Sequence, residues 1–121
     1  MFKILIVEDD KELSLLFQKV LEKSGYQVKS ASDGAQALEV LDREYIDLII
    51  SDIMMPVMDG IEAAKAIRAL PEDKYQKLPI IALTANAMVD ARKEFLNAGM
   101  NGFVAKPIDF AITENGKIVD L

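Results

Sequence analysis

Short apolar runs and stretches of helical periodicity alternate along the chain. The apolar runs have few polar breaks and predict strands at residues 2–7, 47–51, 79–84 and 102–105, while alternation of apolar and polar residues predicts a further strand at 26–32. Between them, apolar residues recur three and four positions apart and predict helices over residues 11–24, 33–43, 59–70 and 87–98. Residues 71–78 are polar, contain a proline and predict a linker. This alternation predicts an α/β fold, a doubly wound parallel sheet of five strands flanked by helices on both faces.

Residues that favour helix ends stand at the predicted boundaries. Asp10 precedes the first helix, where an N-cap belongs, and Gly25 follows that helix as a C-terminal cap. Gly99 stands at the end of the last predicted helix. The spacing of a capping box occurs twice, at Asp33 and Gln36 and again at Asp59 and Glu62.

The composition narrows the kinds of chemistry that the chain can perform. Its 121 residues, 51% of them apolar, suit one domain with one sizeable core. No apolar stretch reaches ~18 residues, and the apolar start is too short for a signal peptide, so we expect a cytoplasmic protein without a membrane span. The net charge of −6 argues against nucleic-acid binding. Without Cys or His, the chain has no thiolate zinc site, no disulfide and no histidine of its own for catalysis.

Charged and hydroxyl side chains stand where the predicted strands end. Glu8 and Asp9 follow the first strand, and Asp52, Thr84 and Lys106 end or follow the third, fourth and fifth. Ligands of such sheets bind at the carboxyl ends of the strands, so we expect the three carboxylates to share one cleft. Two like charges about 4 Å apart repel by up to ~4 kcal/mol at an effective dielectric of about 20. A hard divalent cation, Mg²⁺ above all, relieves this repulsion with oxygen ligands.

Four stretches together resemble the receiver domains of response regulators, over residues 1 to about 108. They are residues 4–9 with the acidic pair, 52–60 (Asp-Ile-Met-Met-Pro-Val-Met-Asp-Gly), 83–85 (Leu-Thr-Ala) and 106–107 (Lys-Pro). Residues 83–88 are also similar to the receivers of hybrid sensor kinases. The resemblance implies the strand order 2-1-3-4-5. It also implies a switch of two-component signalling that takes a phosphoryl group from a histidine kinase or a histidine phosphotransfer domain.

The resemblance also implies a role for each acidic residue. Asp52 looks like the phosphoacceptor. Asp9 looks like a direct ligand of Mg²⁺, Glu8 like a ligand acting through water, and the backbone carbonyl of Met54 like a further ligand. A carboxylate can act as the nucleophile toward phosphorus, which agrees with the role of Asp52.

Three further residues match positions that respond to the phosphoryl group. Thr84 resembles the switch hydroxyl, Lys106 the lysine that pairs with the phosphate, and Phe103 the switch aromatic three positions before the lysine. A domain of this kind catalyses only its own phosphorylation and dephosphorylation, so we do not expect a conventional enzyme.

The same residues argue against two other functions. A flavodoxin-like cofactor binder needs a phosphate-binding loop after the first strand, where this chain carries acidic residues that would repel phosphate. A phosphatase with an Asp nucleophile usually has a second Asp two positions later, where this chain has Met54. A degenerate or engineered receiver that serves only as a protein-interaction module stays open as the alternative.

The end of the chain departs from the receiver pattern, which usually closes with a fifth helix. Residues 109–121 lack helical periodicity, and Asn115-Gly116 between two β-branched pairs favours a hairpin over a short frayed helix. We therefore divide the chain into a receiver domain, residues 1–108, and an atypical tail, residues 109–121. Without the fifth helix, one face of the sheet should expose apolar side chains. We expect a homodimer through residues 108–121 to bury these side chains.

Overall fold

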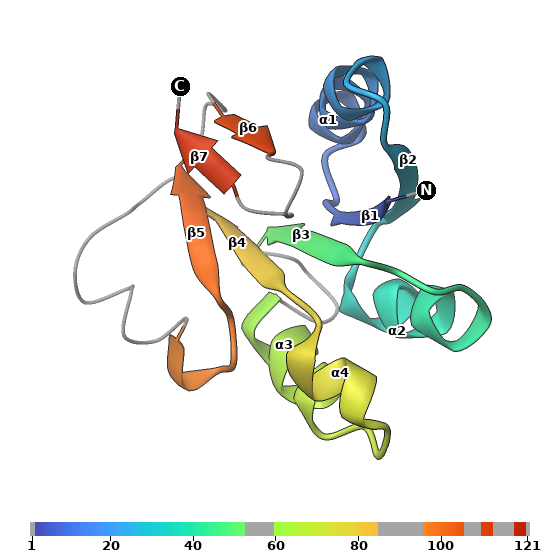
Figure 1. Cartoon of the computed structure of the whole chain (residues 1–121), viewed down its shortest axis with the longest axis vertical. Coiled ribbons are helices and arrows are strands. Elements are labelled where there is room, and N and C mark those ends of the chain that lie inside the picture. Colours follow the sequence, from blue (N-terminus) through green and yellow to red (C-terminus); the bar gives the residue numbers. More distant parts are fainter. Residues whose placement is uncertain (1, 53–59, 85–95, 106–109, 113–117, 121) are drawn as a thin grey trace.

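The computed structural model describes residues 2–52, 60–84, 96–105, 110–112 and 118–120 (Figure 1). The strands of the main sheet are β1 (Lys3–Val7), β2 (Gln27–Ala31), β3 (Leu48–Asp52), β4 (Ile80–Thr84) and β5 (Gly102–Ala105). The helices with described bounds are α1 (Lys11–Lys23), α2 (Gly34–Arg43), α3 (Gly60–Arg68) and α4 (Asp73–Lys77). Two short strands, β6 (Phe110–Ile112) and β7 (Ile118–Asp120), close the chain.

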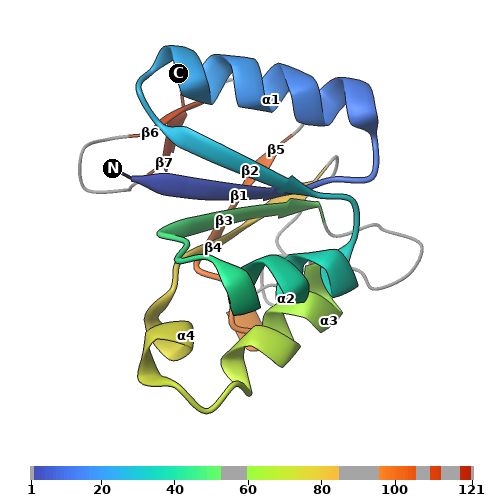
Figure 2. The same cartoon turned by 90° about the vertical axis from the view of Figure 1, so that its right-hand side faces the viewer.

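The main sheet is parallel, and its strand order is β2-β1-β3-β4-β5, as the receiver resemblance implies. Figure 2 shows α1 on one face of this sheet and α2 and α3 on the other. The predicted doubly wound α/β fold is therefore confirmed. None of the helices in the described ranges has the length and apolar character to cross a membrane.

The apolar strands supply two cores because alternate side chains point to opposite faces. Ile4 and Ile6 of β1 belong to the core under α1, together with Phe17 of that helix. Leu5 and Val7 of the same strand belong to the core on the α2 and α3 side. All four β1 side chains are at most 1% exposed, which explains why this strand reads as a continuous apolar run.

The predicted helix caps are present where the structure describes them. Asp10 Oδ1 accepts hydrogen bonds from the amides of Glu12 at 3.0 Å and Leu13 at 3.2 Å. Asp33 Oδ1 accepts from the amide of Gln36 at 2.9 Å. Gly25 and Gly99 have φ angles of 97° and 96°, the left-handed conformation that follows a helix end. The predicted cap at Asp59 lies outside the described residues, as does most of the helix predicted over 87–98.

The prediction of a linker over residues 71–78 was wrong, because this segment contains the short helix α4. Its buried residue, Tyr75, is 9% exposed and belongs to the core that α2 and α3 cover. A helix of five residues with one buried side chain has too few apolar positions to show helical periodicity in the sequence. Tertiary packing, rather than the local pattern, accounts for the helix.

The described residues of the tail form two short strands, where the sequence predicts a hairpin. β6 and β7 pair antiparallel, with Ala111 opposite Val119, while the turn at Asn115-Gly116 lies outside the described residues. Figures 1 and 2 both show this pair of strands on the α1 side of the sheet. The expectation of an exposed sheet face was wrong for the described residues, since Ile50 and Leu83 on this side are at most 1% exposed.

Candidate functional site

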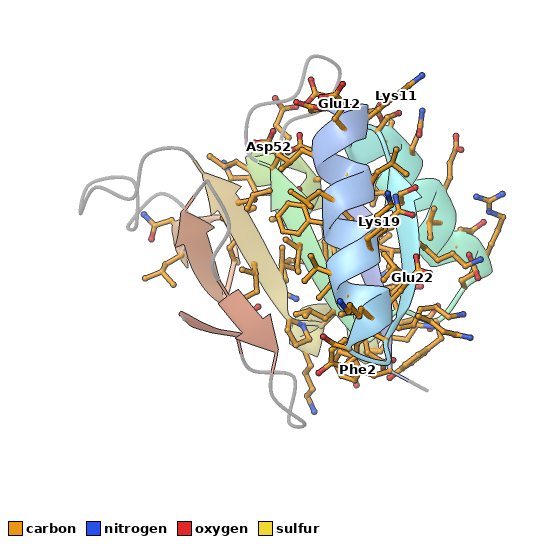
Figure 3. All side chains as sticks on the ribbon, turned by 90° about the horizontal axis from the view of Figure 1, so that it is seen from above. Phe2, Lys11, Glu12, Lys19, Glu22 and Asp52 are labelled. Atoms are coloured by element: carbon orange, nitrogen blue, oxygen red, sulfur yellow. The ribbon has the colours of Figure 1, made fainter. Side chains whose placement is uncertain are left out.

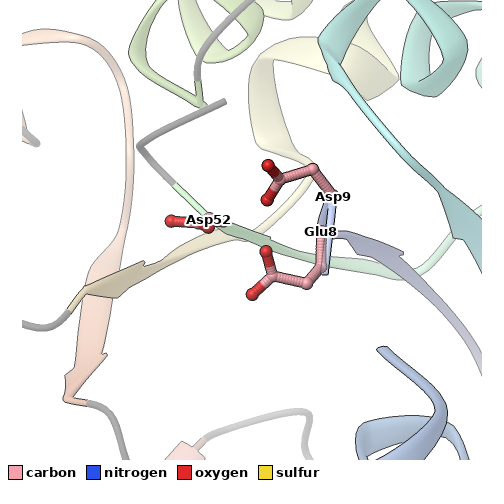
Figure 4. A group of neighbouring side chains, drawn as sticks. All are labelled: Glu8, Asp9 and Asp52. Carbon is pink, nitrogen blue, oxygen red and sulfur yellow. The ribbon is translucent and has the colours of Figure 1, made fainter. Parts of the chain in front are cut away.

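Three carboxylates come together at the carboxyl edge of the sheet. β1 and β3 are parallel neighbours with Val7 opposite Ser51, so the residues that follow Val7 lie beside the end of β3. One carboxylate oxygen from each of Glu8, Asp9 and Asp52 lies within 4.8 Å of the other two (Figure 4). The structure therefore brings the three carboxylates together as the sequence predicts.

The surroundings of the three carboxylates suit a bound cation. Glu8 is only 3% exposed and Asp52 only 5%, whereas Asp9 faces solvent. Burial disfavours the charged form of a carboxylate, and neighbouring like charges disfavour it further. A donor set made only of carboxylate oxygens is that of a hard divalent ion, and the exposed side at Asp9 leaves room for water ligands. These residues fit Mg²⁺, the ion that the sequence predicts.

Asp10 has a different task from its two acidic neighbours. Its side chain accepts the two amide hydrogen bonds that cap α1, and it is not among the three clustered carboxylates. The amide of Asp10 in turn lies 3.5 Å from Oε2 of Glu8. The sequence prediction that Asp10 is a helix cap is confirmed.

The structure brings the ends of β4 and β5 to the same edge as Asp52. Asp52 pairs with Leu83, and Thr84 pairs with Ala105, so the fourth and fifth strands end together. Lys106 follows Ala105 directly in the sequence but lies outside the described residues, as does Met54. The structure describes the backbone of Phe103, which pairs with Ala82 in the middle of β5.

A serine that the sequence analysis did not single out holds the backbone of Asp52. The hydroxyl of Ser51 is buried and donates a hydrogen bond of 3.0 Å to the carbonyl oxygen of Asp52. The available signal was a single polar residue inside an apolar strand. Figure 3 shows Asp52 at the same end of the molecule as Lys11 and Glu12, which begin α1, and far from Phe2.

Known proteins are similar to this chain in both sequence and fold. Hybrid signal transduction histidine kinase B of Dictyostelium discoideum is 41% identical over 115 residues, which cover 88% of this chain and 6% of the kinase. The chemotaxis protein CheY4 of Vibrio cholerae superposes with a TM-score of 0.85 at 35% identity, over 90% of this chain and 89% of that one. The chain thus spans only a small part of the kinase but nearly all of the chemotaxis protein.

A second similar structure contains a metal ion. The receiver domain of the sensor histidine kinase PA1611 of Pseudomonas aeruginosa superposes with a TM-score of 0.79 at 40% identity, over 89% of this chain and 87% of that one. That structure has a magnesium ion coordinated in its active site cleft.

The match to a family model covers nearly the whole chain. The model of the response regulator receiver domain matches residues 4–114, which include the main sheet from the second residue of β1 onward and the three clustered carboxylates. The resemblance inferred from four short stretches is therefore confirmed over the whole fold. This chain belongs to the response regulator receiver family, the signalling switches of two-component systems.

Proposed function

We propose that Asp52 accepts a phosphoryl group in a reaction that requires Mg²⁺. The observation that carries the proposal is the grouping of Glu8, Asp9 and Asp52, with oxygens within 4.8 Å of one another, at the edge where the strands end. Asp52 is the one of the three that stands on the central strand β3, between the acidic pair and the end of β4. It therefore lies between the proposed metal ligands on one side and Thr84 on the other.

The chain's own groups divide the work of the transfer. A carboxylate oxygen of Asp52 forms the new bond to phosphorus, while the bond between phosphorus and the donor nitrogen breaks and leaves its electron pair on the nitrogen. Glu8 and Asp9, together with Asp52 and the backbone carbonyl of Met54, would hold the metal. Mg²⁺ bound there would neutralise the negative charge of the phosphoryl oxygens.

Thr84, Lys106 and Phe103 would convert the new phosphoryl group into a change of conformation. We assign to Lys106 an ion pair with a phosphoryl oxygen, and to Thr84 a hydrogen bond donated by its hydroxyl to another oxygen. The pairing of Thr84 with Ala105 supports this assignment because it aligns the ends of β4 and β5 beside Asp52. Phe103 would move together with Thr84, and this movement would alter the surface that a partner protein contacts.

The donor in this proposal is the phosphohistidine of a histidine kinase or of a histidine phosphotransfer domain. The chain itself has no His, so the phosphohistidine lies outside these 121 residues. The similarity to part of a hybrid histidine kinase supports such a donor. We further propose that the chain catalyses only its own phosphorylation and dephosphorylation, and that it does so in the cytoplasm.

The test uses a small phosphodonor such as acetyl phosphate, with and without Mg²⁺. The wild-type chain should gain one acid-labile, hydroxylamine-sensitive phosphoryl group, and chelation of the metal should prevent this. Asp52→Asn should gain none, whereas Asp42→Asn, at an exposed carboxylate of α2, should behave as wild type. Labelling of Asp52→Asn would refute the assignment. A wild-type chain that takes no label would favour the alternative of an interaction module.

We also propose that the chain forms a homodimer through its tail. Among the described residues β6 and β7 pair only with each other, so each has an edge open to another strand. Three apolar side chains of α1 add exposed surface, Leu15 at 55%, Leu16 at 54% and Val20 at 46%. Light scattering over a concentration series should show the dimer mass, and removal of residues 110–121 should abolish it. A monomer at all concentrations would contradict the proposal.

A further inference from the structure

The side chain of Arg68, the last residue of α3, is held by main-chain carbonyls and one amide side chain. Its Nε and Nη2 donate to the carbonyl of Gly99 at 2.9 and 2.6 Å. Nη1 donates to the carbonyls of Tyr75 at 2.8 Å and Leu78 at 2.7 Å. Nη2 also donates to Oδ1 of Asn101 at 2.8 Å. Arginine has five N–H donors, so these five hydrogen bonds occupy all of them.

The absence of a side chain at Gly99 leaves room for the side chain of Arg68. Its φ angle of 96° is one that side-chain-bearing residues rarely adopt. A Cβ atom at this position would stand 2.7 Å from Cγ of Arg68 and 3.1 Å from Nε. Any side chain at position 99 would therefore push Arg68 out of its place.

Asn101 connects Arg68 to the first pair of residues where β4 and β5 meet. Its side-chain Oδ1 accepts from Arg68 and also from the main-chain amide of Ile80 at 2.9 Å, and its main-chain amide donates to the carbonyl of Ile80 at 2.8 Å. The ladder between β4 and β5 begins at the next pair, Ile81 with Gly102. Asn101 is thus fixed opposite Ile80 from one side by the sheet and from the other by Arg68.

From these contacts we infer that Arg68 is a positioning residue for phosphoryl transfer, which sets the register between β4 and β5. If β5 slipped by one residue along β4, every side chain of β5 would turn to the opposite face of the sheet. The register at Asn101 therefore decides which residues pair at the carboxyl ends of the two strands. At that end the same ladder places Thr84 opposite Ala105, the residue before Lys106. The inference rests on the proposed function, because it assigns Thr84 and Lys106 to the phosphoryl oxygens.

The metal ligands are independent of this contact. Glu8 and Asp9 follow β1, and Asp52 ends β3, whereas the five hydrogen bonds of Arg68 reach only α4, the turn before β4, and the turn before β5. Loss of Arg68 should therefore lower the rate of phosphoryl transfer but leave the Mg²⁺ affinity unchanged. A general loss of folding would lower both. Mg²⁺ affinity depends on β1 and β3, and the rate of transfer depends also on β4 and β5.

The experiment compares Arg68→Met, Gly99→Ala and the matched control Lys65→Gln, an exposed residue of the same helix. For each folded variant, calorimetry gives the Mg²⁺ affinity, and labelling with acetyl phosphate at saturating Mg²⁺ gives the transfer rate. Arg68→Met and Gly99→Ala should bind Mg²⁺ within about twofold of wild type and transfer at least about tenfold more slowly, since misplacement by about 1 Å can cost about a hundredfold. Lys65→Gln should change neither.

Amide exchange supplies a readout that does not depend on transfer. The amide of Ile80 should exchange faster in Arg68→Met, while the amides of β1 and β3 keep their protection. If Arg68→Met does not fold, Asn101→Ala replaces it, because this change removes the acceptor of one of the five hydrogen bonds. Asn101→Ala should slow the transfer by a smaller factor and leave the Mg²⁺ affinity unchanged. An unchanged transfer rate in the folded variants would overturn the inference, as would equal losses of affinity and rate. Labelling of the wild type and of Lys65→Gln tests the proposed function separately.

Discussion

The hydroxyl of Tyr75 in α4 donates a hydrogen bond of 3.1 Å to the carbonyl oxygen of Leu41 in α2. Leu41 lies in the last turn of its helix, where carbonyls have no partner within the helix. Tyr75 therefore supplies the missing donor while its ring lies in the core. The contact joins two helices on the α2 and α3 side of the sheet and explains why the short α4 is stable.

Tyr75→Phe should lower the free energy of unfolding by about 1–2 kcal/mol, because it leaves the buried carbonyl of Leu41 without its donor. The measurement is urea denaturation followed by circular dichroism. Tyr45→Phe is the matched control, since Tyr45 is 65% exposed and its change should stay within about 0.5 kcal/mol. Equal effects of the two substitutions would show that the hydrogen bond to Leu41 contributes nothing.

Substitution of the two neighbouring aspartates should affect different properties. Asp9→Ala removes one of the three clustered carboxylates and should weaken Mg²⁺ binding by at least about tenfold. Asp10→Ala removes the cap of α1 and should lower the free energy of unfolding by about 1 kcal/mol while the Mg²⁺ affinity stays near the wild-type value. Calorimetric titration and thermal denaturation of both variants check the two effects, and similar losses of affinity would contradict the assignment.

The lifetime of the phosphoryl group should depend on Met54, two residues after the proposed acceptor. A thioether cannot donate a hydrogen bond, so it cannot orient an attacking water in that way. Met54→Asn supplies an amide donor and should shorten the lifetime several-fold. A time course of phosphate release from the labelled protein gives the rate for both chains. A variant that releases phosphate at the wild-type rate, or more slowly, would count against this role.

Acid should weaken a cluster of charges at the end of α2. Oε1 of Glu44 lies 3.4 Å from Nζ of Lys3 and 3.5 Å from Nζ of Lys29. Desolvation by itself would raise the pKa of Glu44, but the hydrogen bonds and charges of the two lysines outweigh it, so the pKa is lowered from the ordinary 4.5. The resulting stabilisation is fully present above 4.5 and is lost as the pH falls through the lowered pKa.

Glu44→Gln should therefore reduce the dependence of the melting temperature on pH in the acid range. The difference in melting temperature between wild type and Glu44→Gln should be largest at neutral pH and should shrink below the ordinary pKa. Raised salt should reduce the difference as well, because the side chains are partly exposed and such pairs are screened. A difference that does not change with pH would show that the carboxylate charge is not involved.

The elements with local signals were predictable from the sequence. β1 and β3 are apolar because both of their faces are covered, and Asp10 and Asp33 cap helices through hydrogen bonds to residues two or three positions away. The clustering of Glu8 with Asp52 was predictable as well, because parallel strands bring their ends to one edge.

The features that depend on distant contacts were not predictable in the same way. The helix α4 is held by Tyr75 and Leu41, 34 positions apart in the sequence. Arg68 reads as a charged residue on the outside of a helix, and nothing near it in the sequence reveals that it bonds to Gly99, 31 positions later. The roles of such side chains can be identified only from the folded structure, because their partners are distant in the sequence.

The contact between Arg68 and Gly99 also limits how this sequence can evolve. A side chain at position 99 and a full-length arginine at position 68 compete for the same space, since the added Cβ would stand 2.7 Å from Cγ. A lineage that gains a larger residue at position 99 must therefore also shorten or redirect the side chain at 68. In related sequences a side chain at position 99 should therefore occur only where position 68 carries a residue shorter than arginine or one turned away from position 99.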